Sequence, residues 1–425
     1  MDELAAEIRA HYCKVRRQSE TLCAGLEPED LCLQGMPDTS PLKWHLAHTT
    51  WFFETFVLKP FHAGYQSFND CFEYLFNSYY NAVGKQYPRP RRHLLSRPTV
   101  REVSAYRQMV DECVLGLLES PGTADCAELC HRLILGLNHE QQHQELMLTD
   151  LKYCLSLNPL APVYNDTPIP ASQASPLTFS EFPGGDGEMG CGRAGGQADS
   201  VGGFCYDNEG PRHRVWRAPF GLANRLVSNG EYIEFIEAGG YRTPAWWHSD
   251  GWATVQSEQW RMPLYWRREG QRYVAFTLHG ELEVDPAAPV CHVSLYEAQA
   301  FAAWKNLRLC RESEWEQAAA GVAPAGQLWN RLCHHPLAPP ANQPQPRQLY
   351  GAVWEWTQSA YSAYPGYRAQ AGALGEYNGK FMLNQMVLRG GSVATPADHI
   401  RATYRNFFYP RDRWQFSGIR LAYDL

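Results

Sequence analysis

No stretch of this 425-residue chain reaches the roughly 18 apolar residues that a membrane-spanning helix needs, and its 13 cysteines include no Cys-x-x-Cys pair. The first residues are acidic and form no apolar signal core. We therefore expect a cytoplasmic protein with reduced thiols rather than a disulfide framework or a structural zinc site. Basic residues are outnumbered, 38 Lys and Arg against 45 Asp and Glu, and this balance argues against nucleic acid as a partner.

The chain changes character near residue 158. Before this point, Leu-rich helical periodicity predicts four long helices, at 2–24, 40–59, 98–119 and 124–156. Residues 158–179 are rich in proline and polar residues, as in a linker. From residue 180 onward Gly, Trp and Tyr are frequent, and helical periodicity is limited to 228–238, 294–305 and 311–320. We expect two domains, 1–157 and 180–425, the first a four-helix bundle.

The most informative motif lies in the fourth predicted helix. His139 and His143 are one helical turn apart, so their imidazoles lie on one face and can share a metal ion. A third histidine from the second predicted helix could complete a three-nitrogen site, and His45 and His48, about 60° apart on an ideal helix, are the candidates. Glu145 lies on another face of its helix, so we expect it to support the site rather than bind the metal.

The same residues spell His-Glu-x-x-His, the zinc metalloprotease motif. A thermolysin-type site needs a Glu roughly 20 residues downstream, but residues 160–166 contain none. The third histidine of the metzincin extension is also missing. A zinc peptidase and a non-catalytic binding module are the alternatives to a metal-dependent oxidoreductase. Metal content separates them.

Short motifs of the second half recur, in this order, in one known fold. They are Phe182–Gly185, Asn208–His213, Val227–Tyr232, Pro289–Ser294, Glu312–Glu316, Gly351–Trp356, Arg389–Ser392 and Gly418–Arg420. As a set they resemble the formylglycine-generating-enzyme (sulfatase-modifying factor) domain, which is related to C-type lectins. The resemblance implies an α+β fold class for the whole chain. No cysteine follows Arg389–Ser392 at 393–401, so formylglycine generation is not expected.

A DinB-like helical bundle joined to such a domain resembles the EgtB-type sulfoxide synthases of ergothioneine biosynthesis, including the selenoneine synthase (SenA) relatives. The resemblance implies a non-haem Fe(II) enzyme that uses O2 to join a thiol sulfur to the imidazole C2 of hercynine, the trimethylated betaine of histidine. It places the iron ligands on His48, His139 and His143. Three neutral imidazoles leave open positions on Fe(II), as facial triads do in other iron oxygenases.

The resemblance also indicates residues for substrate binding. Gln142 and Asn406 stand where family members contact hercynine. A trimethylammonium group cannot donate hydrogen bonds, so aromatic faces suit it, and Phe407, Phe408 and Trp414 are available for cation–π contact. For Trp414, packing in an aromatic-rich core is the alternative.

Residues 77–92 are too polar and too rich in proline for a bundle helix, so we expect a functional loop. In the cysteine-using branch of the family, the matching tyrosine pair lies beside the iron. Tyr79 and Tyr80 are therefore candidates for proton delivery during oxygen activation, and Arg89 for a bidentate clamp on a substrate carboxylate. We expect Arg91 and Arg92 to belong to a solvated basic turn.

Departures from the family pattern leave the chalcogen donor open. The branch that uses γ-glutamylcysteine has a Trp-Asp pair after Arg-Asn, but this chain has Phe407 and Phe408 there. The cysteine-using branch often has cysteines where Leu383 and Val393 stand. The selenoneine synthase relatives join a selenosugar to hercynine instead. Cysteine, another small thiol and a selenosugar are the three candidate donors.

Overall fold

The computed structural model describes residues 2–120, 125–192, 200–330, 332–340 and 346–425. They group into two units, which we describe separately. Unit 1 contains 1–157, 193–207 and 367–380, so two segments of the second half of the chain belong with the helices. Unit 2 contains 158–192, 208–366 and 381–425.

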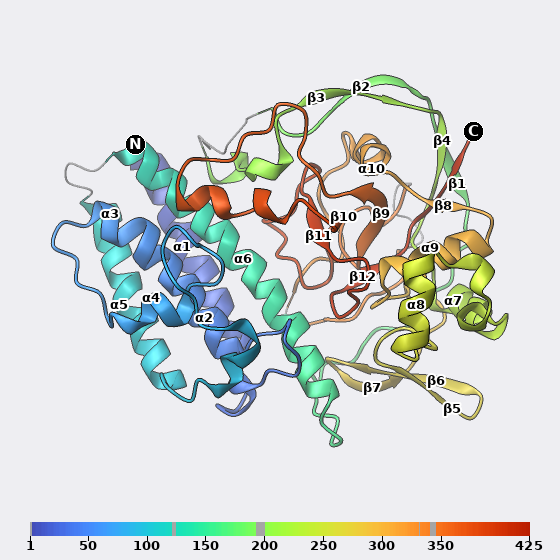
Figure 1. Ribbon diagram of the computed structural model, residues 1–425, viewed down its shortest axis with the longest axis horizontal. Helices are drawn as coiled ribbons and strands as arrows, with labels where there is room; N and C mark the ends of the chain where they lie inside the picture. Colours follow the sequence, from blue (N-terminus) through green and yellow to red (C-terminus); the bar gives the residue numbers. More distant parts are fainter. Residues whose placement is uncertain (1, 121–124, 193–199, 331, 341–345) are drawn as a thin grey trace. The chain divides into compact units, whose positions relative to one another are not determined.

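Unit 1 has the four long helices predicted from the sequence, which pack side by side (Figure 1). Shorter turns connect them, and the helix after α1 continues through a π-helical turn into a short α-helix. The helical elements among the described residues up to 157 are α1 (Asp2–Leu22), η1 (Asp30–Cys32), α2 (Leu42–Phe53), η2 (Glu54–Leu58), α3 (Lys59–Phe61), α4 (Cys71–Phe76), η3 (Arg89–Leu94), α5 (Val100–Glu119) and α6 (Cys126–Ser156). The bundle confirms the predicted helical first domain.

Local sequence fixes where these helices begin, and a glycine sets how closely two of them approach. Thr99 and Glu102 form a capping box at the start of α5. The Asp125 carboxylate caps α6 by accepting from the N–H groups of its first turn. At Gly136 of α6, a Cβ atom would lie only 2.6 Å from the Phe53 ring of α2. The missing side chain therefore lets the two histidine-bearing helices pack closely.

Unit 2 contains two four-stranded sheets, ordered β1-β4-β13-β8 and β11-β10-β9-β12, a β2-β3 pair and a β5-β6-β7 meander (Figure 1). Most pairings are antiparallel, and β12 with β9 is parallel. The strands are β1 (Phe179–Phe182), β2 (Gly185–Met189), β3 (His213–Arg217), β4 (Phe220–Ala223), β5 (Trp266–Glu269), β6 (Arg272–Thr277), β7 (Gly280–Glu283), β8 (Arg308–Leu309), β9 (Trp354–Ala360), β10 (Met386–Arg389), β11 (Asn406–Phe408), β12 (Ser417–Gly418) and β13 (Leu421–Asp424).

The α-helices of unit 2 are short. They are α7 (Asn229–Glu237), α8 (Ser249–Ser257), α9 (Leu295–Trp304) and α10 (Glu312–Ala319). Three of them match the segments 228–238, 294–305 and 311–320 predicted from the sequence, and α8 is an addition. With helices and sheets both present, the α+β class is confirmed. None of the helices in the described ranges has the length and apolarity to cross a membrane.

The prediction that all cysteines are reduced is wrong for two of them. Cys191 and Cys205 are disulfide-bonded, whereas eleven others are free. The bond was not predictable, because these two cysteines are 14 residues apart among thirteen scattered cysteines with no recognisable disulfide spacing.

Candidate metal centre

His48 of α2 and His139 and His143 of α6 meet in the core of unit 1. All three side chains are buried, with 0%, 1% and 9% exposed. One ring nitrogen from each lies within 4.8 Å of the others. The histidines of α6 are one turn apart, and α2 brings the third against them, as the spacing predicted.

Hydrogen bonding fixes which nitrogen of His48 faces the cluster. Its Nδ1 lies 2.6 Å from the carbonyl oxygen of Phe76, and since a carbonyl only accepts, Nδ1 carries the hydrogen. The lone pair of His48 is therefore on Nε2, which lies 3.2 Å from Nε2 of His139. Metal–nitrogen bonds of about 2.1 Å that meet at right angles place two nitrogens roughly 3.0 Å apart. The arrangement thus fits two ligands of one cation.

Burial keeps these imidazoles neutral. It is the main cause that lowers the pKa of His48 and His143 well below the ordinary histidine value, and it lowers the pKa of His139 to about 3. Neutral rings have the lone pairs that a metal needs, and ring nitrogens 3.2 Å apart are close enough to bind one ion. Three nitrogens without a thiolate suit Fe(II), among other divalent ions.

Glu140, the glutamate of the His-Glu-x-x-His motif, points away from the cluster into a buried ionic network. Its Oε2 accepts from Arg16 at 2.8 Å, and its Oε1 accepts from Ser19 at 2.6 Å and from Arg107 at 2.9 Å. Burial alone would raise the pKa of this carboxyl, but Arg16 and Arg107 outweigh burial and hold it at about 2. A metallopeptidase needs this glutamate as a general base beside the metal. The zinc-peptidase alternative therefore has no structural support.

Replacing Glu140 with glutamine should destabilise the fold rather than empty the metal site. The substitution removes the charge that pairs with Arg107 and Arg16, although Arg16 keeps its bond to Asp111, and loss of one partner of a buried ion pair costs about 3–5 kcal/mol. Chemical denaturation measures the loss, and metal content of the folded fraction should stay near wild type. Because the pKa is depressed, the stabilisation is complete above pH 4.5 and is lost as pH falls toward 2.

The matched control is Glu128→Gln on the same helix. Glu128 pairs with Arg132 on the surface, and such exposed pairs contribute at most about 1 kcal/mol. Equal stabilities for the two variants would contradict the structural role of Glu140.

The predicted tyrosine pair lies near a third tyrosine that sequence reasoning missed. Tyr79 and Tyr80 stack at 4.6 Å, and Tyr80 is fully buried against the rings of Trp51 and Phe56. Tyr377, from the 367–380 segment of unit 1, lies closer to the histidines. Its ring meets His139 edge-on at 5.4 Å.

The Tyr377 hydroxyl donates to the Gln142 side chain, one residue before His143. Its ring also stacks on Tyr206 at 5.5 Å and meets the edge of Tyr79 at 6.4 Å. The predicted substrate residue Gln142 is thus held beside the cluster by a residue more than two hundred positions away in sequence. No local pattern around Tyr377 indicates this.

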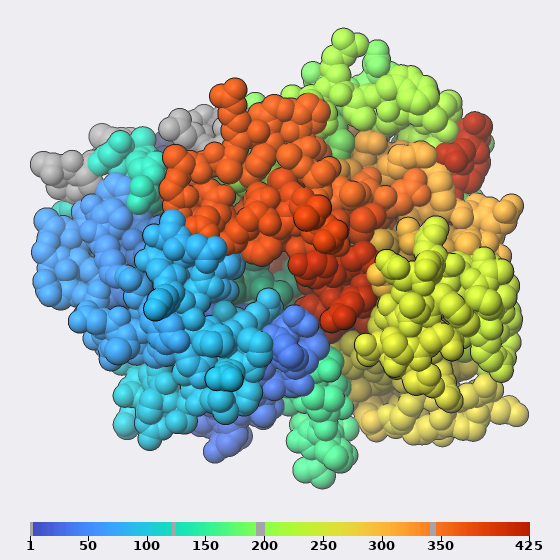
Figure 2. All heavy atoms as spheres, in the orientation of Figure 1, coloured from blue at the N-terminus to red at the C-terminus, as the bar shows by residue number. Residues whose placement is uncertain are grey.

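The three arginines of the 77–92 loop have different surroundings. Arg89 is exposed, and its guanidinium donates to the Asp38 carbonyl rather than to the interior. Arg91 is exposed as expected, but the expectation of a solvated Arg92 is wrong. Arg92 is 3% exposed and lies 3.3 Å from the ring centre of Trp44, which itself stacks on His48 at 4.6 Å. Figure 2 shows the cyan-blue segment before α5 at the surface of unit 1.

The remaining predicted substrate residues belong to unit 2. Asn406, Phe407 and Phe408 form β11, the edge strand of its sheet. Phe407 stacks on Tyr361 at 4.0 Å, and Phe408 meets Trp414 edge-on at 5.7 Å. All four predicted side chains are half-buried, so each keeps some accessible surface.

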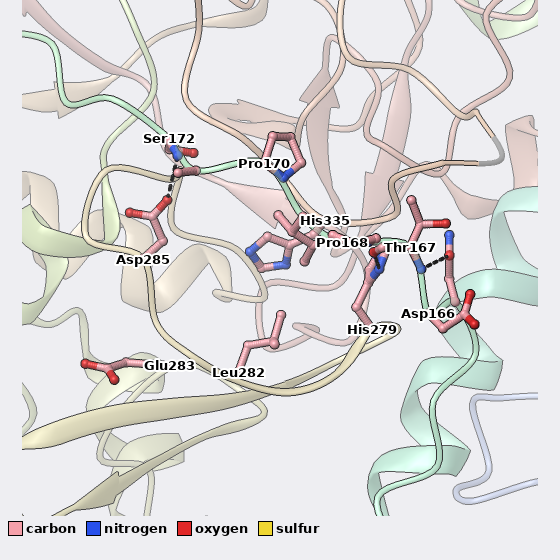
Figure 3. Close-up of a pocket in the computed structure, with 13 residues that line it drawn as sticks. Asp166, Thr167, Pro168, Pro170, Ser172, His279, Leu282, Glu283, Asp285 and His335 are labelled. Atoms are coloured by element: carbon pink, nitrogen blue, oxygen red, sulfur yellow. Dashed lines mark hydrogen bonds between the residues drawn. The ribbon is translucent and has the colours of Figure 1, made fainter.

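Unit 2 also has an open pocket of about 500 Å³ that none of the predicted site residues lines. The pocket is lined by residues 165–172 of the predicted linker and by other residues that include His279, Asp285 and His335 (Figure 3). The Asp285 carboxylate accepts the backbone N–H of Ser172 and so holds the linker segment against the unit.

Two family models cover nearly the whole chain. Residues 11–147 match the DinB superfamily, and residues 168–336 and 338–425 match the sulfatase-modifying factor enzyme 1-like domain. The formylglycine-generating-enzyme-like domain expected from the motifs is therefore confirmed.

Two curated relatives match this chain over nearly its full length, and a third matches about half of it. The hercynine oxygenase of Mycolicibacterium smegmatis is 31% identical and covers 99% of this chain and 100% of its own. That of Mycobacterium tuberculosis is 29% identical, with 99% of both chains covered. Ergothioneine biosynthesis protein 1 of Schizosaccharomyces pombe is 27% identical over 52% of this chain and 27% of its own. With both domains matched in order and full-length similarity to such relatives, the chain belongs to the EgtB-type hercynine oxygenase family.

Proposed function

We propose that the protein is an Fe(II)- and O2-dependent oxidoreductase of ergothioneine biosynthesis, which joins the imidazole C2 of hercynine to a small thiol such as cysteine. The observation that carries the proposal is the buried cluster of three neutral imidazoles, His48, His139 and His143. The names of the relatives support hercynine as the substrate. The reaction balances with O2 alone: a thiol, a C–H bond and O2 give a sulfoxide and water.

Iron bound by the three histidines would supply oxygen activation and leave coordination positions for substrates. The surrounding residues have separate roles. Gln142, held by Tyr377, orients hercynine from α6. The hydroxyls of Tyr79 and Tyr377 are the candidate proton or hydrogen-bond donors, because the Tyr377 ring lies against His139 and the Tyr79 ring contacts Tyr377. For unit 2, the family resemblance supports Asn406 as a hercynine contact and the rings of Phe407, Phe408 and Trp414 as partners of a trimethylammonium group.

The test uses the full chain loaded with Fe(II) without oxygen and then given hercynine, O2 and one donor. Cysteine, γ-glutamylcysteine and selenoglucose are offered separately, and products are identified by mass. We expect an adduct of hercynine with cysteine that carries one added oxygen. Product formation with zinc in place of iron, or no adduct with any donor, would refute the proposal.

A selenosugar donor is the second candidate, and the position of Arg89 favours it. An amino-acid donor has a carboxylate that needs a buried cation, whereas the Arg89 guanidinium is exposed and already donates to a carbonyl. A neutral sugar needs hydroxyl partners instead, typically worth about 1 kcal/mol each. Enzyme that uses selenoglucose at lower concentrations than cysteine would establish this alternative.

Arg89→Met therefore should have only a small effect on the KM for either donor. Exposed ion pairs contribute at most about 1 kcal/mol, so we expect the KM for cysteine to rise no more than about fivefold and the KM for selenoglucose to stay unchanged. Steady-state kinetics with both donors and both proteins measures this, and Arg91→Met is the matched exposed control. A rise on the order of a hundredfold for cysteine alone would show that Arg89 closes on the donor carboxylate in the complex.

A further inference from the structure

A line of buried polar contacts runs from His143 to the protein backbone. The Nδ1 atoms of His143 and His45 lie 2.8 Å apart. Nε2 of His45 lies 3.1 Å from Oδ2 of Asp150, which also accepts the backbone N–H of Ser40 at 2.8 Å. His45 and Asp150 are each 2% exposed, so water does not compete for these bonds.

Helix spacing builds this line. Asp150 is two turns after His143 on α6, which places both on one face, and His45 extends from α2 between them. His45 is not part of the metal cluster, because the nitrogen that could bind a metal faces His143 instead.

The contacts determine where the hydrogens lie. A carboxylate only accepts, so Nε2 of His45 carries a hydrogen and donates to Asp150. Since Nδ1 of His143 faces His45, a metal can reach His143 only through Nε2, which must then hold the lone pair, so Nδ1 of His45 is the acceptor. The hydrogen between the two rings is therefore on Nδ1 of His143. This leaves the lone pair of His143 on Nε2, the nitrogen available to a metal.

We propose that Asp150 and His45 form a positioning relay that fixes the tautomer and the ring orientation of His143 for metal binding. Neither residue contacts the metal. The inference rests on the proposed metal function and extends it to two residues outside the ligand set. Hydrogen-bond partners of metal-binding histidines typically contribute 10- to 100-fold in metal affinity, and we expect the relay to fall in this range.

The first experiment needs no metal. In metal-free protein labelled with 15N-histidine, ring nitrogen shifts report the tautomer. We expect His143 to carry its hydrogen on Nδ1 in the wild type, and to be a mixture of tautomers in His45→Phe. His131→Phe, which changes another buried histidine of α6, should leave the His143 signals unchanged. A wild-type His143 with its hydrogen on Nε2 would overturn the relay.

The second experiment measures Co(II) affinity by competition with a chelator, because Co(II) reports binding without turnover. We expect His45→Phe and Asp150→Leu each to bind Co(II) 10- to 100-fold more weakly, and the double variant to be no weaker than the worse single variant. In His45→Gln an amide oxygen can accept from His143, so most of the affinity should return. Wild-type affinity in both single variants would overturn the proposal.

Two further results separate failure of the relay from other failures. If the wild type binds neither Co(II) nor Fe(II), the proposed function fails, while the metal-free tautomers still decide the relay. If Asp150→Leu does not fold, Asp150→Asn replaces it. The amide oxygen still accepts from His45 and Ser40, so a loss smaller than that of His45→Phe supports the relay, and an equal loss contradicts it.

Discussion

Alanine at His48, His139 or His143 is expected to remove most of the bound iron and nearly all turnover. Each ring supplies one of three nitrogens within 4.8 Å, so two remaining ligands hold the ion poorly. The loss in metal affinity should exceed the roughly 100-fold typical of residues that act only through a ligand. Iron content after anaerobic reconstitution and the turnover with hercynine measure both effects.

The fold should survive these substitutions because the bundle core lies around the cluster and does not depend on it. Trp51, Phe52, Leu133 and Leu137 are each completely or almost completely buried. His131→Ala is the control, since it removes a buried histidine from the same helix without touching the cluster. Near-normal iron and turnover in His48→Ala would exclude the three-histidine site.

Helices were predictable from the sequence where a capping signal and helical periodicity agree. In unit 2 the predicted α7 and α9 begin with capping boxes, Ser228 with Glu231 and Ser294 with Glu297. The missed helix α8 has no side-chain cap, since its N-cap residue is His248. Short helices without a capping signal form through tertiary packing, which one sequence does not display.

The pairing of His139 with His143 was predictable for the same reason, since a spacing of one turn is a local property of α6, whereas the choice of His48 on α2 depended on the family resemblance. The environment of the 77–92 loop was not. Arg89 and Arg92 have the same charge in the same proline-rich run, yet only Arg92 is buried against Trp44. In a segment without periodicity, the sequence carries no signal for which side chain points inward.

The contact between Tyr377 and Gln142 is a part of the candidate site that could not be predicted from the sequence. The two residues are 235 positions apart, and Tyr377 lies in a short irregular segment that joins unit 1 from the second half of the chain. Only tertiary structure brings such residues together.

Among substitutions that leave the three ligand histidines in place, Tyr377→Phe is the one from which we expect the largest loss of turnover. It removes the hydroxyl that donates to Gln142 and leaves the ring against His139 and Tyr206. Turnover should fall roughly 10- to 1000-fold, the range for a positioned proton or hydrogen-bond donor. Iron content should stay at the wild-type level, and the KM for hercynine should change less than turnover.

The tyrosine pair provides the comparison. Tyr79→Phe should lower turnover within the same range, because it removes a proposed donor hydroxyl beside Tyr377 while keeping the ring. Tyr80→Phe should stay closer to wild type, because its ring packs against Trp51 and Phe56 in the core. Unchanged turnover in Tyr377→Phe would remove this residue from the chemistry. Unchanged turnover in the Tyr79→Phe/Tyr80→Phe double variant would assign the pair to packing, since a donor that matters to an intermediate cannot be removed without slowing the step that needs its proton.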